Sequence, residues 1–168
     1  MCAANTTQVI SSILTTTYNA AKEIDSPPSL LLPTEGDGNA LRQYTYDSVS
    51  QPPVDSFQSP FLGWELEKIG EFLSKNTRGT VVDQAVFLVA DGQTANDKET
   101  LLLVHNLDGS LQSVRVSAAY GNTEAISVSV ASKDLDELRS LVDDDGVFRG
   151  GRRGQPPKKG GRAPKKQL

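Results

Sequence analysis

Three short segments between residues 85 and 117 constrain the fold of this chain more than any other feature of its sequence. The segments Ala85–Ala90 and Thr100–Asn106 each contain a block of consecutive apolar side chains, which is typical of strands covered on both faces. The turn signal Leu107-Asp108-Gly109 follows, and Leu111–Ser117 then alternates apolar and polar residues, though imperfectly. The pattern predicts two buried strands, the second of which forms a hairpin with a third.

Two further segments are predicted to be strands. Leu30–Leu32 is an apolar run that ends at Pro33, and the residues from Ile126 to Val130 alternate strictly between apolar side chains and serine. Alternation around Arg42–Asp47 is compatible with an additional edge strand in a region otherwise rich in turn residues. With the three segments above, these runs predict a sheet of about five strands.

Helices are predicted where apolar side chains recur three and four residues apart. Residues 9–22 and Gly63–Asn76 have this spacing, and Trp64, at the start of the second, is either an exposed recognition anchor or a packing residue. A third helix is expected from Ser132, which can cap it, to about Val142. The expected fold is therefore a single compact α/β (α+β) domain, with a mixed sheet of about five strands and two or three helices.

Charge is divided unevenly along the chain. Residues 1–148 contain all 21 acidic and nine of the 17 basic residues, a net charge of −12, whereas residues 149–168, here called the basic segment, contain eight basic residues and no acid, a net of +8. The segment is also rich in glycine and proline, which predicts disorder. We therefore expect an N-terminal helical extension at residues 1–26, an α/β domain at residues 27–150 and a disordered basic tail at residues 151–168.

The basic segment is the strongest local indication of function. The stretch Arg149–Gly154 resembles the RGG segments that bind RNA, and cations at this density attract phosphate without reading sequence. Because the segment has no aromatic residues, it cannot stack on bases. A nuclear-import signal or a solubilising tail that shields the acidic body are alternatives. The predicted nucleic-acid-binding residues are Arg149, Arg152, Arg153, Lys158, Lys159, Arg162, Lys165 and Lys166.

Catalytic and metal-binding alternatives depend on few residues. His105, the only histidine, is a possible general base, and Asp91 follows a strand at a position where α/β folds often carry functional groups. Structural roles at a strand end and in a turn are the simpler interpretations. The three aspartates Asp143–Asp145 are a candidate Mg²⁺ or Ca²⁺ site, although adjacent carboxylates usually stay solvated. No catalytic triad or nucleotide-binding motif can be assembled, so we expect no catalytic residues, no metal site and no cofactor.

The N-terminus and the cysteine content restrict the class of protein. Cys2 is the only cysteine, which excludes an intrachain disulfide and a cysteine zinc cluster. The N-terminus has no basic start followed by an apolar run, and no stretch approaches the roughly 20 apolar residues that span a bilayer. We therefore expect an intracellular protein, cytoplasmic or nuclear, that is not secreted and does not contact membranes.

The order of several motifs resembles that of a known family. Over residues 80–150 the chain contains VFLVADGQT, LLLVHNLDG, SVRVS, GNTEAISVSV and DDDGVFRGG, and SLLLPTEG precedes them at residues 29–36. This order is similar to that of small uncharacterised α/β domains, known from actinobacteria and fungi, that typically end in Asp-Gly-Val-Phe-Arg-Gly. The resemblance implies one compact domain of unknown function, and it carries no catalytic residues. It covers neither the N-terminal extension nor the basic tail.

The sequence thus favours a non-catalytic interaction domain whose basic segment makes weak, non-specific contacts with RNA, DNA or another polyanion. One alternative is a protein-binding module that uses the acidic body to dock an unknown partner. The other is an enzyme with a site near Asp91 and His105.

Overall fold

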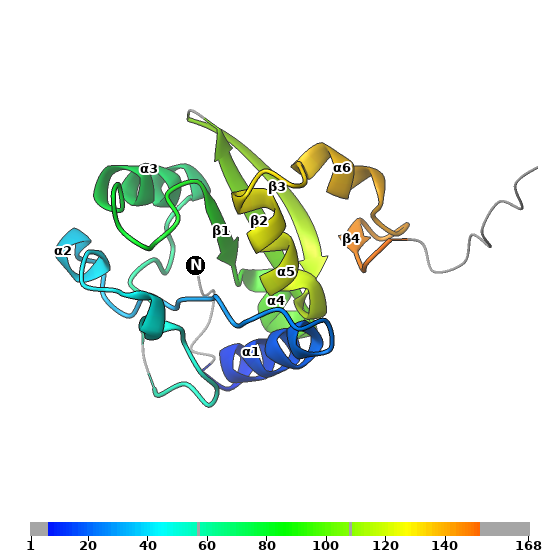
Figure 1. Ribbon diagram of the computed structural model, residues 1–168, viewed down its shortest axis with the longest axis horizontal. Coiled ribbons are helices and arrows are strands. Elements are labelled where there is room, and N and C mark those ends of the chain that lie inside the picture. The colour runs from blue at the N-terminus through cyan, green and yellow to red at the C-terminus, as the bar shows by residue number, and fades with distance from the viewer. Residues whose placement is uncertain (1–6, 57, 108, 152–168) are drawn as a thin grey trace, which may run out of the picture.

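In the computed structural model, which describes residues 7–56, 58–107 and 109–151, a four-stranded sheet forms the centre of the protein (Figure 1). The strand order is β1 (Val86–Val89), β2 (Thr100–Leu107), β3 (Ser110–Ser117) and β4 (Val147–Phe148). The first three strands pair antiparallel, whereas β4 runs parallel to β3. The described residues thus form an α+β domain with a mixed sheet, which confirms the predicted fold class.

The hairpin between β2 and β3 is confirmed. Its register runs from Thr100 opposite Ser117 to Leu107 opposite Ser110, and Gly109 in the turn has a φ of +89°. Such a backbone conformation favours glycine, because a side chain would be strained there. Leu103 and Val104 on β2 are completely buried, so this strand is covered on both faces as its sequence predicts.

Two long helices cover the sheet. Helix α1 (Thr7–Lys22) packs against α5 (Ala118–Ser129), and α5 lies across β1, β2 and β3 (Figure 1). The hydroxyl of Thr17, which is completely buried, donates a 2.7 Å hydrogen bond to the carbonyl oxygen of Ala118 at the start of α5. Val9 and Ile13 of α1 belong to the same apolar core as the central strands, so the predicted first helix is part of this core.

A second group of helical segments lies between α1 and β1 in the chain. It comprises α2 (Gly38–Leu41), the 3₁₀ helix η1 (Tyr46–Ser48) and α3 (Leu66–Asn76), and α3 confirms the second predicted helix with a later start. Trp64 is half-buried just before α3, 5.5 Å from the ring of Phe61 and 5.7 Å from that of Phe72 between centroids, and both ring pairs are edge-to-face. The ammonium of Lys68 lies 4.0 Å from the centre of the Trp64 ring. Trp64 therefore packs at the helix start.

Three predictions of strand structure are wrong. Leu30–Leu32 has no regular secondary structure and does not pair with the sheet. Its backbone bonds to Ser50 instead: the N–H of Ser50 donates to the carbonyl oxygen of Leu30, and the hydroxyl of Ser50 accepts from the N–H of Leu32. Arg42–Asp47 contains no strand, since α2 precedes it and η1 overlaps it. Ile126–Val130 belongs mostly to α5, where Val128 is buried but Val130 is 66% exposed. Five alternating residues are compatible with a strand or with a helix, and the packing of α5 on α1 favours the helix.

The region after β1 and the last predicted helix also differ from expectation. Residues 92–99, for which no helix was predicted, contain the short helix α4 (Gly92–Asp97), which Asp91 caps. The last helix is α6 (Leu135–Ser140), and its cap is Asp134 instead of the predicted Ser132. The side chain of Asp134 accepts a hydrogen bond from the N–H of Glu137. The described residues therefore contain six α-helices and four strands, where two or three helices and about five strands were expected. None of these helices has the length and apolar character needed to cross a membrane.

Candidate functional site

The C-terminal motif Asp145–Gly150 builds the edge of the domain, which the sequence analysis did not predict. Val147 and Phe148 form β4 and pair with Arg115 and Val116 of β3. Phe148 is only 2% exposed, belongs to the main apolar core, and meets the ring of Tyr120 edge-to-face at 5.6 Å. The apolar pair of this motif therefore completes the core.

A tight turn precedes β4. The N–H of Gly146 donates to the carbonyl oxygen of Asp143 at 2.9 Å, and the N–H of Asp143 donates to the carbonyl oxygen of Val147 at 3.0 Å. Gly146 has a φ of +77°, which explains a glycine at this position. The carboxylate of Asp145 accepts the N–H of Val147 at 3.1 Å. This turn places Asp143 and Asp145 beside the residue that follows β4.

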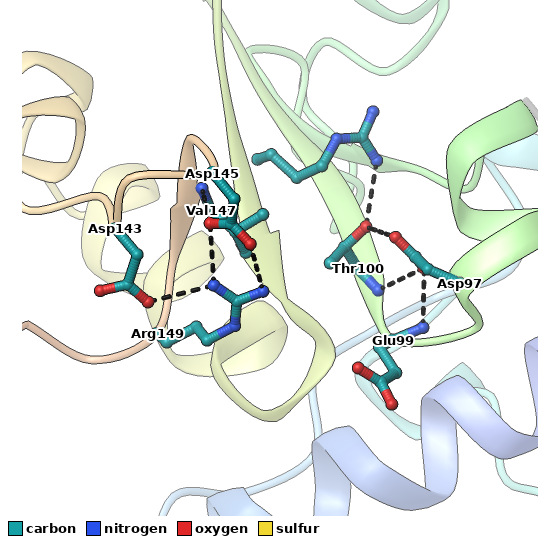
Figure 2. A network of polar contacts seen from close by, with 8 residues as sticks. Asp97, Glu99, Thr100, Asp143, Asp145, Val147 and Arg149 are labelled. Atoms are coloured by element: carbon teal, nitrogen blue, oxygen red, sulfur yellow. Dashed lines mark hydrogen bonds and ion pairs between the residues drawn. The ribbon is translucent and has the colours of Figure 1, made fainter.

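That residue is Arg149, and its guanidinium binds both carboxylates (Figure 2). Nη1 donates to Asp143 at 3.0 Å and to Asp145 at 2.9 Å, while Nη2 donates to the second oxygen of Asp145 at 2.8 Å. The hydrogen bonds from Arg149 and from the Val147 N–H lower the pKa of Asp145, and the two carboxylates raise that of Arg149. Together with Val142 and Asp144, these side chains line an open hollow of about 500 Å³.

The same geometry bears on the metal candidate. Within the described ranges, no group of three or more His, Cys, Asp or Glu side chains is arranged to hold a metal ion. Asp143 and Asp145 instead face the cationic side chain of Arg149, which supplies the positive charge that two adjacent carboxylates attract. The chemistry of this site is electrostatic: it holds one cation against two anions.

Gly150 provides a test of how closely the end of the motif packs. A Cβ at Gly150 would lie 2.1 Å from the Tyr120 hydroxyl oxygen, whereas one at Gly151 would meet no atom within 4 Å. Both residues have a positive φ, +85° and +82°, so the backbone strain of an alanine is similar at the two positions. Gly150→Ala is therefore expected to lower the free energy of unfolding by about 1–3 kcal/mol more than Gly151→Ala, as measured by urea denaturation. Equal losses would show that the Tyr120 contact does not restrict Gly150.

A second polar network includes Asp91, one of the residues considered for catalysis. Arg115 on β3 pairs with both oxygens of Asp91, and the two side chains are 13% and 22% exposed, respectively. Asp91 also accepts the N–H of Thr94 at 3.0 Å as the cap of α4. Burial alone would raise the pKa of Asp91, but the hydrogen bonds from Arg115 and Thr94, with the charge of Arg115, lower it.

The network continues to the beginning of β2. Thr100 donates its hydroxyl to Asp97 at 2.6 Å, and Asp97 also accepts the N–H groups of Glu99 and Thr100 (Figure 2). Nη1 of Arg115 lies 3.4 Å from the same Thr100 hydroxyl. The guanidinium of Arg115 therefore connects the carboxylate of Asp91 with the Thr100 hydroxyl that binds Asp97. Contacts from Asp91 to Arg115 and from Asp97 to Thr100 join the two ends of α4 to β3 and to the start of β2, so the network holds α4 on the sheet.

His105 is remote from Asp91. The register places His105 opposite Val86 at the beginning of β1, whereas Asp91 follows the end of that strand and contacts the region of Thr100 through Arg115. His105 and Thr100 are five residues apart on one strand, which corresponds to about 17 Å. The structure therefore does not bring the two candidate catalytic residues together.

Two buried polar residues on α5 were missed by the sequence analysis. Glu124 is 3% exposed and both of its oxygens bind the ammonium of Lys133, at 2.9 and 3.0 Å. Asn122 is completely buried, accepts from the N–H and hydroxyl of Ser29, and donates to the carbonyl oxygen of Pro27. Neither side chain stands out in the sequence, since a polar residue is recognised as buried only when its helix is placed. Both fasten neighbouring segments to α5.

Of the eight predicted nucleic-acid-binding residues, the structure describes Arg149 alone. The other seven lie outside the described residues, and their role stays a prediction: Arg152, Arg153, Lys158, Lys159, Arg162, Lys165 and Lys166.

Fold and site together define a small α+β domain whose C-terminal motif closes the core and contains an arginine held by two aspartates. The chain belongs to the family described as a domain of unknown function (DUF6924), whose model matches residues 43–151. Neither the curated proteins nor the solved structures contain a match to this chain. The matched range begins after α1, although α1 packs on α5, and it ends directly after the C-terminal motif.

Proposed function

We propose that this protein is a non-catalytic interaction domain whose basic segment makes weak, non-specific contacts with RNA, DNA or another polyanion. The observation that carries the proposal is the division of charge, −12 over residues 1–148 and +8 over residues 149–168. An acidic body repels nucleic acid, whereas eight cations within 20 residues attract it. The basic residues after Gly151 also lie beyond the range matched by the family, so they are an addition to the family's domain.

The place where the basic segment leaves the domain supports this proposal. Figure 1 shows β4 at the margin of the domain, on the side away from α2 and α3. The end of β4 is therefore at the periphery of the domain, where a large ligand is accessible. We also propose that closure of the core by Asp145–Gly150 is common to the family, because the matched range ends at residue 151.

The two alternatives differ in how they relate to the geometry. A protein partner that docks on the acidic body remains the second candidate, since the charge of −12 favours a basic partner. An enzyme site near Asp91 and His105 has less support, because Asp91 is paired with Arg115 and because His105 on β2 lies opposite the start of β1, whereas Asp91 follows the end of that strand.

The proposal is tested by the salt dependence of binding. Anisotropy of labelled single-stranded RNA and duplex DNA would be measured with the full chain from about 50 to 200 mM salt. We expect the logarithm of the association constant to fall linearly with the logarithm of the salt concentration, with a slope of about 4–6 in magnitude. Each neutralised phosphate contributes about 0.7–0.9 to this slope.

The matched control is a full-length variant in which the seven basic residues from Arg152 to Lys166 are replaced by glutamine. This variant keeps every described residue and is expected to lose the binding. Undiminished affinity of the variant would contradict the proposal, because the body would then contain the binding site. Failure of both proteins to bind would leave a protein partner of the acidic body as the leading candidate.

A further inference from the structure

We propose that Asp143 and Asp145 act as an intramolecular competitor for Arg149, so that Arg149 is withheld from the polyanion that the rest of the basic segment contacts. This inference rests on the proposed function and defines where its binding site begins. The first arginine of the basic segment then belongs to the folded body, and the polyanion-binding cations start at Arg152.

The hydrogen-bond geometry supports this division. Arg149 donates three hydrogen bonds to two carboxylates, and its pairing with Asp145 uses both terminal nitrogens. Arginine binds phosphate with the same two-nitrogen arrangement. The carboxylates therefore occupy three of the five N–H donors of the guanidinium, including the end-on pair formed by both terminal nitrogens. A phosphate must displace Asp145 to bind Arg149 in the same end-on arrangement.

The backbone around Arg149 is also restrained. Phe148 before it is buried in the core, and Gly150 after it lies so close to Tyr120 that a Cβ would overlap the ring. Arg149 consequently cannot leave the aspartates by movement of the chain without loss of these contacts. Only the side chain of Arg149 can turn away, and it would then lose its ion pairs with Asp143 and Asp145.

Electrostatics act in the same direction. The hollow beside Arg149 is lined by three aspartates, Asp143, Asp144 and Asp145, so that the cluster with Arg149 carries a net charge of −2. A phosphate that approaches Arg149 enters this negative field and is repelled. No such aspartate follows residue 149 in the sequence, so the later cations have no acidic neighbours along the chain.

The experiment compares two single substitutions in the full chain, Arg149→Gln and Arg152→Gln, which remove the same charge three residues apart. Binding of labelled single-stranded RNA would be measured as a function of salt. We expect Arg152→Gln to reduce the slope by about 0.7, the contribution of one phosphate contact, and Arg149→Gln to leave it unchanged. An equal reduction by both substitutions would overturn the inference, because Arg149 would then contact phosphate as the other cations do.

The aspartates provide the second test. The double substitution Asp143→Asn with Asp145→Asn is expected to release Arg149 and to raise the slope by about 0.7. Adding Arg149→Gln to this variant should remove the gain. The charge control is Asp47→Asn with Asp55→Asn, which alters two exposed aspartates in the segment before α3 and should raise affinity without increasing the slope. A gain that persists without Arg149, or that the control reproduces, would contradict the inference.

Failure of the inference and failure of the proposed function are distinguishable in these data. If the wild-type chain binds neither RNA nor duplex DNA at any salt concentration, the proposed function fails and the inference with it. If the wild-type chain binds and Arg149→Gln behaves as Arg152→Gln does, only the inference fails. Thermal unfolding of each variant would establish that the compared proteins are folded.

Discussion

Phe148→Ala is expected to lower the free energy of unfolding by about 3–5 kcal/mol, the usual cost of truncating a buried phenylalanine. Phe148 is 2% exposed, lies in the main apolar core and packs edge-to-face on Tyr120. It also belongs to β4, a strand of only two residues. Urea denaturation followed by circular dichroism would measure the change.

The control for this prediction is Tyr46→Ala. Tyr46 is 85% exposed, so its truncation is expected to change stability by no more than about 0.5 kcal/mol. A loss below about 1 kcal/mol for Phe148→Ala would mean that β4 is not part of the cooperative core. In that case the C-terminal motif would be an appendage of the domain instead of its closing element.

Asp91→Ala is expected to lower the free energy of unfolding by about 2–4 kcal/mol, because it removes the partner of a largely buried arginine together with a helix cap. Arg115 is 13% exposed, and the substitution leaves its guanidinium without the carboxylate that it contacts through both terminal nitrogens. The helix α4 also loses the hydrogen bond from the Thr94 N–H to Asp91. Equilibrium urea denaturation at pH 7 would measure the loss.

Asp136→Ala is the matched control, since it breaks an aspartate–arginine pair on the surface. Asp136 pairs with Arg139 at 2.9 Å, but the two side chains are 75% and 41% exposed. Such exposed pairs contribute about 0–1 kcal/mol, so the control should be nearly neutral. Equal effects of the two substitutions would show that burial adds nothing to the Asp91–Arg115 pair.

The difference between wild type and Asp91→Ala should also depend on pH. Burial raises the pKa of Asp91, but the hydrogen bonds from Arg115 and Thr94 outweigh it, so the folded-state pKa is lower than the unfolded value of about 3.9. The stabilisation is therefore complete above the unfolded pKa and is lost as the pH falls through the folded pKa. Urea denaturation at neutral pH and near pH 3 should give a smaller difference at the acidic pH. A constant difference would show that the ionised carboxylate is not the stabilising form.

The elements that were predicted correctly are those in which side-chain periodicity extends over many residues. Helix α1 repeats its apolar spacing over 16 residues, and the β2–β3 hairpin joins two eight-residue strands by a glycine turn. The short segments were ambiguous. Ile126–Val130 alternates over only five residues, and its burial pattern is set by α1, which packs on α5.

The candidate site shows the same limit. Asp143–Asp145 and Arg149 are conspicuous in the sequence, but the aspartates were expected to stay solvated without a metal and the arginine was assigned to a polyanion. Their pairing depends on the tight turn at Gly146 and on the parallel pairing of β4 with β3. The pairing of β4 with β3 is established by contacts with distant residues, which local patterns do not contain.

By itself, then, the sequence determined the central hairpin, the two amphipathic helices α1 and α3, and the division of charge at residue 149. These follow from periodicity, turn chemistry and composition, all of which are local properties of the chain. Only the tertiary structure decided that residues 126–129 are helical, that Val147 and Phe148 complete the sheet, and that Arg149 binds Asp143 and Asp145. Each of these outcomes depends on which apolar surface or which charge the fold places beside the segment. Those neighbours are brought together only when the chain folds.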